Sequence, residues 1–192
     1  MERLIALLQK HRNSTNAAGM EKYMKDQFPY LGIKTPERRP LLSLFLKESG
    51  MDKGPLDRNF VRRLWELPER EYQYAGVDYL IKIRRQLTAG DVEFLQGIIT
   101  NKSWWDTIDP LATVVIGDLA GRYPQIVQEH IEGWSDHANL WLRRTAILFQ
   151  LKYKARTDEN LLYRFITRNE TSKEFFIQKA IGWALREYSK TN

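Results

Sequence analysis

The sequence predicts an all-α protein, and three observations lead to this class. Apolar residues recur at three- and four-residue spacing along nearly the whole chain. No segment alternates apolar and polar residues as a half-buried strand would, and Gly and Pro separate the periodic segments. The second helices of successive pairs are expected to begin near residues 69, 103, 139 and 172, so a helical pair recurs about every 35 residues.

Helix starts are marked by residues that cap or open helices. A Ser or Thr side chain can accept the backbone N–H groups of the first turn, an acid three residues later completes a capping box, and Pro fits the first turn. Such signals occur at Thr35 with Pro36, Thr88 with Asp91, Ser103 with Asp106, Pro124, and Thr171 with Glu174. The helices expected in chain order span residues 2–11, 17–28, 36–49, 56–67, 69–86, 89–100, 104–121, 124–134, 139–154, 158–168 and 172–189.

The regular spacing indicates helical hairpins that stack on one another. A hairpin recurring at this period is typical of HEAT- or TPR-type arrays, in which each hairpin buries its apolar face against the next. Because the TPR pattern of Trp, Leu-Gly and Tyr is missing, a HEAT-like array fits better, and an ordinary helical bundle is the alternative. We expect one domain over residues 1–192 that forms a curved α-solenoid with a concave groove.

Composition removes several classes of site and compartment. The chain has no Cys, which excludes disulfides and thiol nucleophiles, and no metal site is expected because His11, His130 and His137 do not follow a metal-binding spacing. The Gly-rich phosphate-binding loops and the GxSxG elbow of hydrolases are also missing. No apolar run approaches the roughly 20 residues of a membrane span, and Met1 to Leu8 lacks a cleavage site. We therefore expect a cytoplasmic protein without a membrane partner.

Charge is unevenly distributed along the chain. The net charge is +6, and residues 139–192 carry 11 Lys plus Arg against 5 Asp plus Glu. Between Asp91 and Asp136 the balance reverses. A basic region beside an acidic one is typical of a polyanion-binding face with a carboxylate near it, and a solvated helical surface is the alternative.

The segment Lys102-Ser103-Trp104-Trp105-Asp106-Thr107-Ile108-Asp109 holds the strongest chemical signal. Trp105 and Asp109 are four residues apart, so a helix would place an indole and a carboxylate on one face, where both could meet a cation. Asp106 is expected at the third helical position, where it completes a capping box with Ser103. Pro110 disfavours helical geometry at Asp109 and predicts a kink or a late helix start.

The repeat connects Asp109 to other side chains. Steps of 35 residues lead from Asp109 to Arg144 and Lys179, with Tyr74 one step before. These positions should align along equivalent second helices, with Trp105 and Trp183 one turn from Asp109 and Lys179. Trp105 and Trp183 could each pack in the core or contact a ligand.

The sequence resembles a known family, the bacterial AlkD-like DNA alkylation repair proteins, which are HEAT-repeat DNA glycosylases. The similarity spans nearly the whole chain. It is carried by the segment from Lys102 to Asp106 with Asp109, by Trp141-Leu142 with Arg144, and by the runs 146–154, 172–183 and 185–188. Near the N-terminus it is carried by Tyr23-Met24-Lys25, Leu31-Gly32-Ile33 and Thr35-Pro36-Glu37-Arg38-Arg39.

The resemblance implies release of N3- and N7-alkylated purines from double-stranded DNA by cleavage of the N-glycosidic bond. It implies that Asp109 is the catalytic carboxylate, that Trp105 and Trp183 are aromatic walls of the cleft, and that Arg144 contacts the DNA backbone. With it we expect DNA contacts from Tyr23, Lys152, Lys154 and Lys179. No cofactor is implied, since an alkylated purine is already a good leaving group, and we expect a monomer.

A second hypothesis is a non-catalytic paralogue that kept the scaffold and binds DNA or a protein. It is favoured by the short segment from Asn13 to Gly19 and by the lack of a further helical pair after the Trp183 helix. The complete set of Trp105, Asp109 and Trp183 favours the enzyme.

Overall fold

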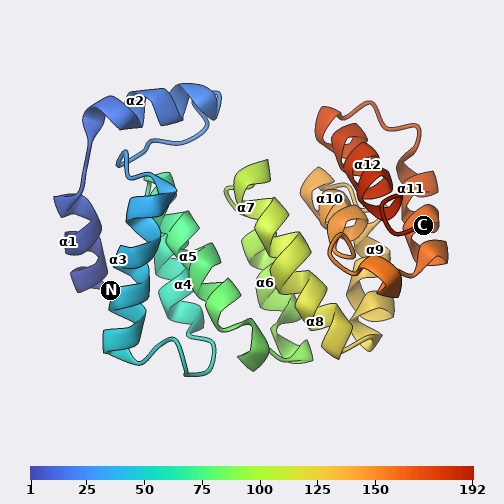
Figure 1. The fold of residues 1–192 in the computed structure, drawn as a ribbon, viewed down its shortest axis with the longest axis horizontal. Coiled ribbons are helices and arrows are strands. Elements are labelled where there is room, and N and C mark those ends of the chain that lie inside the picture. The colour runs from blue at the N-terminus through green and yellow to red at the C-terminus, as the bar shows by residue number, and fades with distance from the viewer. The chain divides into compact units, whose positions relative to one another are not determined.

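The computed structural model describes all 192 residues, and they divide into two compact units, Met1–Gln86 and Leu87–Asn192. Both units consist of helices and their connections, with no β-strand (Figure 1). The predicted all-α class of HEAT-like hairpins is confirmed. The single domain over residues 1–192 and its concave groove stay predictions.

The first unit contains five α-helices and a short 3-10 turn. Helices α3 and α5 pack on one another, α4 and α5 form a hairpin, and α1 packs against α3. The elements are α1 (Glu2–Lys10), α2 (Ser14–Tyr23), α3 (Thr35–Ser49), α4 (Arg58–Glu66), α5 (Arg70–Lys82) and η1 (Arg84–Gln86).

The connection between α2 and α3 is fixed by a buried carboxylate. Glu71 is fully buried at the start of α5, and its oxygens accept the backbone N–H groups of Leu31, Gly32 and Ile33 at 2.8, 2.7 and 3.1 Å. Gly32 has a positive φ of 92°, and a Cβ there would lie 1.9 Å from the Asn13 carbonyl oxygen, so no other residue fits.

Helix α2 differs from its prediction. It spans Ser14–Tyr23, whereas residues 17–28 were expected. Lys25 and Asp26 both have positive φ, at 56° and 55°, and two consecutive left-handed residues end the helix. The N-terminal segment thus forms a helix of 10 residues that Asn13 caps by accepting the Asn16 N–H.

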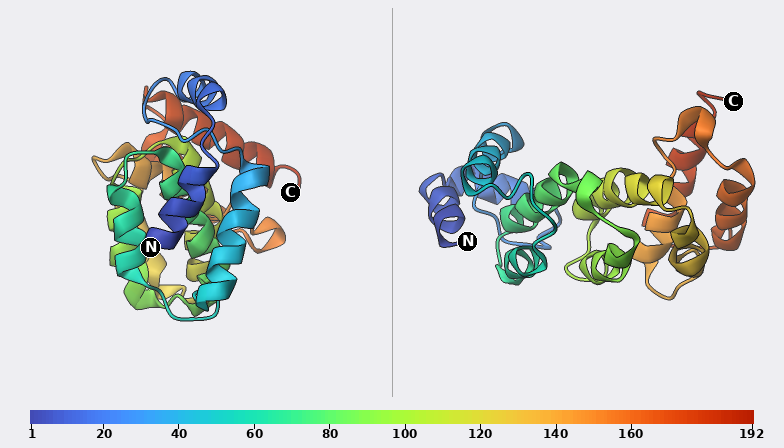
Figure 2. Two further views of the ribbon diagram at one scale, coloured as in Figure 1. Left: turned by 90° about the vertical axis from the view of Figure 1, so that its left-hand side faces the viewer. Right: turned by 90° about the horizontal axis from the view of Figure 1, so that it is seen from below.

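The second unit contains three helical hairpins, seen from further sides in Figure 2. The first joins α6 to a long helix made of α7, a π-helical segment η3 and α8; the others join η4 and α9 to α10, and α11 to α12. The elements are η2 (Ala89–Asp91), α6 (Val92–Ile99), α7 (Trp105–Pro110), η3 (Leu111–Ile116), α8 (Gly117–Arg122), η4 (Val127–Ile131), α9 (Glu132–Trp134), α10 (Leu140–Leu148), η5 (Lys154–Arg156), α11 (Glu159–Asn169) and α12 (Phe175–Tyr188).

The predicted repeat is confirmed by the helix starts. Helices α5, α7, α10 and α12 begin at Arg70, Trp105, Leu140 and Phe175, each 35 residues after the one before. Within the second unit, α10 packs against both α7 and α12. Equivalent positions on neighbouring second helices therefore lie close together in this unit, and this brings the site residues into contact.

The capping predictions have mixed outcomes. The capping box of Thr88 and Asp91 is present. The one predicted for Ser103 is wrong, because the N-cap of α7 is Trp104 and the Ser103 hydroxyl donates to the Ile99 carbonyl at 2.5 Å. The cap predicted at Thr171 is also wrong, since the N-cap of α12 is Glu174.

One hydrophobic cluster of the second unit lies between η3, α10, α11 and α12. Its buried residues are small or branched, which lets α12 approach α10 closely. They are Ala112, Ile147, Leu148, Leu162, Ile177, Ala180 and Ala184. No helix of the protein has the length and apolar character needed to cross a membrane.

Candidate active site

Asp109 and Arg144 form an ion pair between α7 and α10. Arg144 Nε donates to Asp109 Oδ1 at 2.8 Å, and Arg144 Nη2 donates to Asp109 Oδ2 at 3.0 Å. The Arg144 residue is 5% exposed, and the Asp109 side chain is 17% exposed. Two parallel charge-assisted hydrogen bonds fix the plane of the carboxylate. The repeat predicted that these two positions align, and they do.

A third hydrogen bond and an aromatic cluster hold the Arg144 guanidinium. Its Nη1 donates to the Phe176 carbonyl at 2.5 Å, and its Cζ lies 5.8 Å from the Phe176 ring centroid. The Phe176 ring packs against Trp104 and Trp141, with centroids 4.9 Å away in both cases. Residues from α10, α12 and the start of α7 therefore fix the guanidinium and leave it little freedom to turn.

The environment of Asp109 raises the pKa of its carboxyl group above the ordinary value. Burial is the largest cause, because it disfavours the charged form, and the charge of Asp106 adds to it. The hydrogen bonds and charge of Arg144 act in the opposite direction. Asp109 is thus a carboxylate that gains its main stabilisation from one guanidinium.

Trp105 and Asp109 lie on the same regular helix. Trp105 is the first residue of α7 and Pro110 is the last, so the predicted four-residue spacing lies within α-helical geometry. The irregularity expected from Pro110 occurs after Asp109, where the chain continues as π-helical η3. Trp105 is half-buried, with part of its side chain at the surface.

Trp183 and Lys179 lie on α12, which packs against α10. Trp183 is 38% exposed, so it is available to a ligand rather than enclosed in the core. The Lys179 ammonium lies 5.4 Å from the ring centroid of Phe175, an exposed side chain. The row predicted from the repeat therefore splits, since Asp109 and Arg144 form a pair while Lys179 lies over an aromatic ring.

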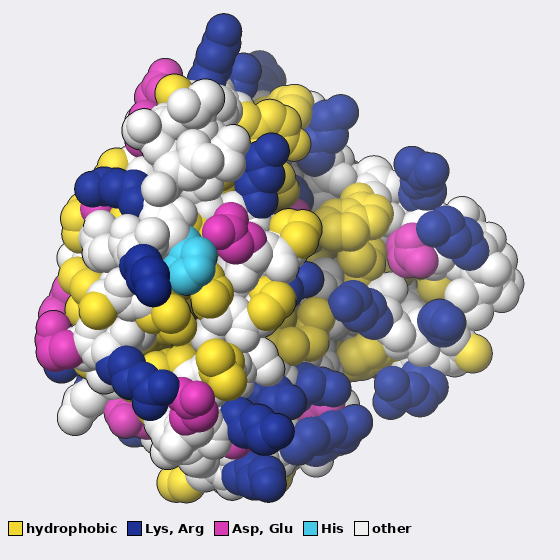
Figure 3. Space-filling view, turned by 60° about the vertical axis from the view of Figure 1, so that its left-hand side comes forward, with side chains coloured by type: hydrophobic (Ala, Val, Ile, Leu, Met, Phe, Trp, Pro, Cys, Tyr) yellow, Lys and Arg dark blue, Asp and Glu magenta, His cyan; other side chains and the backbone are white.

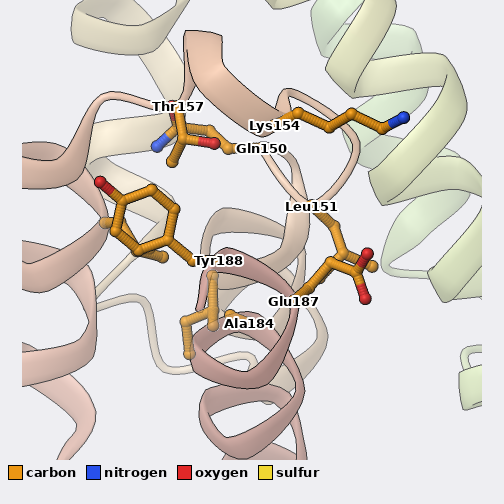
Figure 4. Close-up of a pocket in the computed structure, with 9 residues that line it drawn as sticks. Gln150, Leu151, Lys154, Thr157, Ala184, Glu187 and Tyr188 are labelled. Atoms are coloured by element: carbon orange, nitrogen blue, oxygen red, sulfur yellow. The ribbon is translucent and has the colours of Figure 1, made fainter. Parts of the chain in front are cut away.

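Lys152 and Lys154 follow α10 and are exposed. Lys154 has a positive φ of 53° and lines a small cavity of about 20 Å³ with Gln150, Glu187 and others, from which its side chain extends away (Figure 4). A cavity of this size holds one water at most. Tyr23, at the end of α2 in the first unit, is 71% exposed. The DNA contacts predicted for these residues, and for Arg144, stay predictions.

Asp106 has a local role that differs in detail from the expected one. Its carboxylate accepts the backbone N–H of Thr107 at 3.0 Å in the first turn of α7. Because Trp104 is the N-cap, Asp106 is the second helical residue instead of the third. The negative charge of Asp106 stabilises the N-terminus of α7 through the helix dipole, and it raises the pKa of Asp109.

Two groups at the site escaped the sequence reasoning. One is the Phe176 carbonyl, a backbone group that no residue pattern announces. The other is Thr113, whose Oγ1 donates to the Asp109 carbonyl at 2.8 Å. Thr113 stands four residues after Asp109, a spacing at which Thr often bonds back to its own helix, so this contact could have been found.

Positive charge is not confined to the C-terminal part of the chain. Residues 1–86 hold 17 Lys plus Arg against 11 Asp plus Glu. Figure 3 shows Lys and Arg side chains spread over the face it displays, with acidic side chains between them. In the first unit a hollow of about 360 Å³ between α3 and α5 has Arg39, Lys82 and Arg84 at its rim. Neither unit has a cluster of three or more His, Asp or Glu side chains that could hold a metal ion.

Comparison with known proteins decides the family. The family model for DNA alkylation repair enzymes matches residues 4–192. The chain belongs to this family. Its structure is similar to that of a predicted DNA alkylation repair enzyme from Enterococcus faecalis, with 34% identity and a TM-score of 0.87, covering 94% of this chain and 84% of that one. No curated protein matches the sequence. Membership of the family supports a role in DNA repair.

Proposed function

We propose that the protein is a DNA glycosylase that hydrolyses the N-glycosidic bond of N3- and N7-alkylated purines in double-stranded DNA, acting as a monomer in the cytoplasm. The observation that carries the proposal is the partly exposed Asp109 carboxylate, which is fixed by Arg144 and lies one helical turn from Trp105. An alkylated purine carries positive charge, so its bond to the sugar breaks readily once the resulting sugar cation is stabilised.

The reaction needs a negative charge at a fixed position. As the bond between C1′ and the purine nitrogen breaks, its electron pair stays on the base and neutralises it, and positive charge develops on the deoxyribose. The Asp109 carboxylate stabilises that charge electrostatically, and it can accept a proton from the water that adds to C1′. Chemistry that relies on such a leaving group requires no cofactor.

Arg144 prepares the carboxylate for this role. Each Asp109 oxygen accepts one hydrogen bond from the guanidinium and retains another lone pair. A carboxylate held in this way does not have to reorganise when charge develops, which is how preorganised groups accelerate a reaction. Trp105 and Trp183 add aromatic faces, whose attraction to a cation is worth about 0.5–2 kcal/mol each.

The test is base release from methylated duplex DNA by wild type and Asp109→Asn. The amide keeps the shape and one acceptor oxygen but carries no charge. We expect wild type to release 7-methylguanine and the variant to release none above the spontaneous rate, while its circular dichroism and DNA affinity stay close to those of wild type. Release by the variant at the wild-type rate would refute the role of Asp109.

One observation favours a second candidate, the non-catalytic binding module. Both Asp109 oxygens already accept a hydrogen bond from Arg144, as in an ion pair that only joins two helices. If well-folded wild type binds duplex DNA and releases no base from it, the module is the better description.

A further inference from the structure

The helix that carries Asp109 changes its winding directly after that residue. Pro110 has no N–H to donate to the carbonyl four residues before it. From Leu111 to Ile116 the chain is π-helical, and the Gly117 N–H donates to the Ala112 carbonyl, five residues back. A π-helical turn holds an extra residue compared with an α-helix and is costly unless other contacts support it.

A hydroxyl group supports the start of this turn. Thr113 is 7% exposed, and its Oγ1 donates to the Asp109 carbonyl at 2.8 Å. This hydrogen bond connects η3 to the backbone of Asp109, the residue whose side chain pairs with Arg144. Thr113 therefore fixes the peptide unit from which the Asp109 side chain projects.

A second hydroxyl supports the end of the turn. Tyr153, in the connection after α10, donates from its phenol to the Gly117 carbonyl at 2.6 Å. Burial raises the pKa of Tyr153 to about 12, so the phenol stays a donor at neutral pH. A Cβ at residue 117 would lie 2.6 Å from the Phe149 carbonyl oxygen, so glycine permits this close approach. The π-helical turn is thus held at both ends by side-chain hydroxyls.

Asp109 needs this support because its pairing with Arg144 is directional. Arg144 is itself fixed by Phe176, so it cannot follow a carboxylate that moves. Two hydrogen bonds of 2.8 and 3.0 Å require the carboxylate plane to match the guanidinium plane. A small rotation of the backbone at the end of α7 would break one of them.

We propose that Thr113 is a positioning residue for Asp109, which it serves by holding the α-to-π junction so that the carboxylate faces Arg144 squarely. The catalytic consequence of this inference rests on the proposed function, whereas its effect on the Asp109–Arg144 pair does not.

Thr145 provides a matched control. Its Oγ1 also donates to a carbonyl four residues before it, that of Trp141, at the same distance of 2.8 Å, and it is fully buried. That bond lies within regular α10, where the backbone N–H groups already fix the helix. Loss of the Thr145 hydroxyl should cost stability without changing the Asp109–Arg144 pair.

The first measurement is the pKa of the Asp109 carboxyl group, obtained by an NMR titration of protein labelled with ¹³C in its aspartate side chains. The Asp109 signal is identified by its loss in Asp109→Asn. Because hydrogen bonding to Arg144 lowers this pKa, Thr113→Val should raise it above the wild-type value. Thr113→Ser, which retains the hydroxyl, should restore it, and Thr145→Val should leave it unchanged. The proposal is overturned if Thr113→Val titrates as wild type does, or if Thr145→Val shifts the pKa equally.

The second measurement is single-turnover release of 7-methylguanine. Thr113→Val should lower the maximal rate by roughly 10- to 100-fold with little change in the enzyme concentration that gives the half-maximal rate. In a plot of this rate against pH, the rise on the acidic side should move to higher pH for Thr113→Val. A loss of folded protein alone would not produce such a shift. If wild type releases no base, the proposed function fails, and the NMR titration still decides whether Thr113 positions the pair.

Discussion

Each of the two units contains a largely buried carboxylate near the start of a second helix, and the two are held in different ways. Glu71 accepts three backbone N–H groups and is fully enclosed. The Asp109 carboxylate accepts hydrogen bonds from one guanidinium, and 17% of its side chain is exposed. Glu71 is fully hydrogen-bonded to backbone N–H groups and fixes a loop. Asp109 is oriented by a single charged group and is partly open to solvent, so it can act on a ligand.

The largest expected effect is a loss of stability in Glu71→Gln, to be compared with a loss of activity in Asp109→Asn. Glu71→Gln places an amide where two oxygens accept backbone donors, so an N–H group would face another N–H group. We expect a loss of about 2–4 kcal/mol in the free energy of unfolding of the first unit. Denaturant unfolding followed by circular dichroism measures it. Asp109→Asn is the comparison variant. Its amide also places an N–H against an Arg144 donor, but the site is partly exposed, so we expect a smaller loss of stability than in Glu71→Gln, together with complete loss of base release. Equal destabilisation by both variants would remove the distinction.

The next effect concerns the pH dependence of the site. Base release requires ionised Asp109, and burial raises its pKa, so the rate should rise with pH along a limb whose midpoint lies above the ordinary value of 3.8. Arg144→Met removes the group that lowers this pKa, so the limb should move to higher pH and the maximal rate should fall. Single-turnover rates between pH 4 and about 8, corrected for spontaneous release, test this. An unmoved limb would mean that Arg144 does not control the ionisation of Asp109.

The same raised pKa makes a prediction for folding. A carboxyl group with a raised folded pKa stabilises the protein fully below its unfolded pKa, and this contribution is lost as pH rises through the folded pKa. Wild type should therefore lose some stability across that interval compared with Asp109→Asn, whose amide does not titrate. Thermal unfolding of both proteins over the acidic range measures the difference, and parallel curves would contradict the assigned direction of the shift.

The smallest expected effect comes from Asp106. Its charge adds to the raised pKa of Asp109, so Asp106→Asn should move the acidic limb slightly to lower pH. The amide oxygen can still accept the Thr107 N–H, which preserves the first turn of α7. Asp118→Asn, further along the same long helix, is a control that should leave the limb in place. A shift to higher pH in Asp106→Asn would contradict the electrostatic argument.

The sequence allowed the fold and the alignment of Asp109 with Arg144 to be predicted because both follow from the repeat, whereas the ion pair between them was not predicted. Helix periodicity fixes which face is buried, and the 35-residue period aligns Asp109 with Arg144. The end of α2 was predicted wrongly because Lys25 and Asp26 adopt left-handed backbone that their residue types do not announce. The caps at Ser103 and Thr171 were also wrong, since other residues there occupy the position before the helix.

The remaining features of the site depend on packing between helices. The Phe176 carbonyl and the exposure of Trp183 follow from how α12 lies on α10, which no local pattern contains. For Lys179 the repeat predicted the position on the helix. Its long, flexible side chain, however, lies over the Phe175 ring instead of in a row with Asp109 and Arg144. Register thus predicts which backbones are adjacent more reliably than where long side chains end.

The pairing of Asp109 with Arg144 makes the site sensitive to insertions in an unequal way. Each residue added inside an α-helix turns all later side chains by about 100° around its axis, whereas a residue added to a surface connection turns none. One extra residue in α10 before Arg144 would therefore swing the guanidinium away from α7, although composition and charge would barely change. The connection between α9 and α10 could lengthen without that penalty. The chemistry of this protein is thus tied to a phase relation between two helices, and variation in chain length should collect in the turns that do not disturb it.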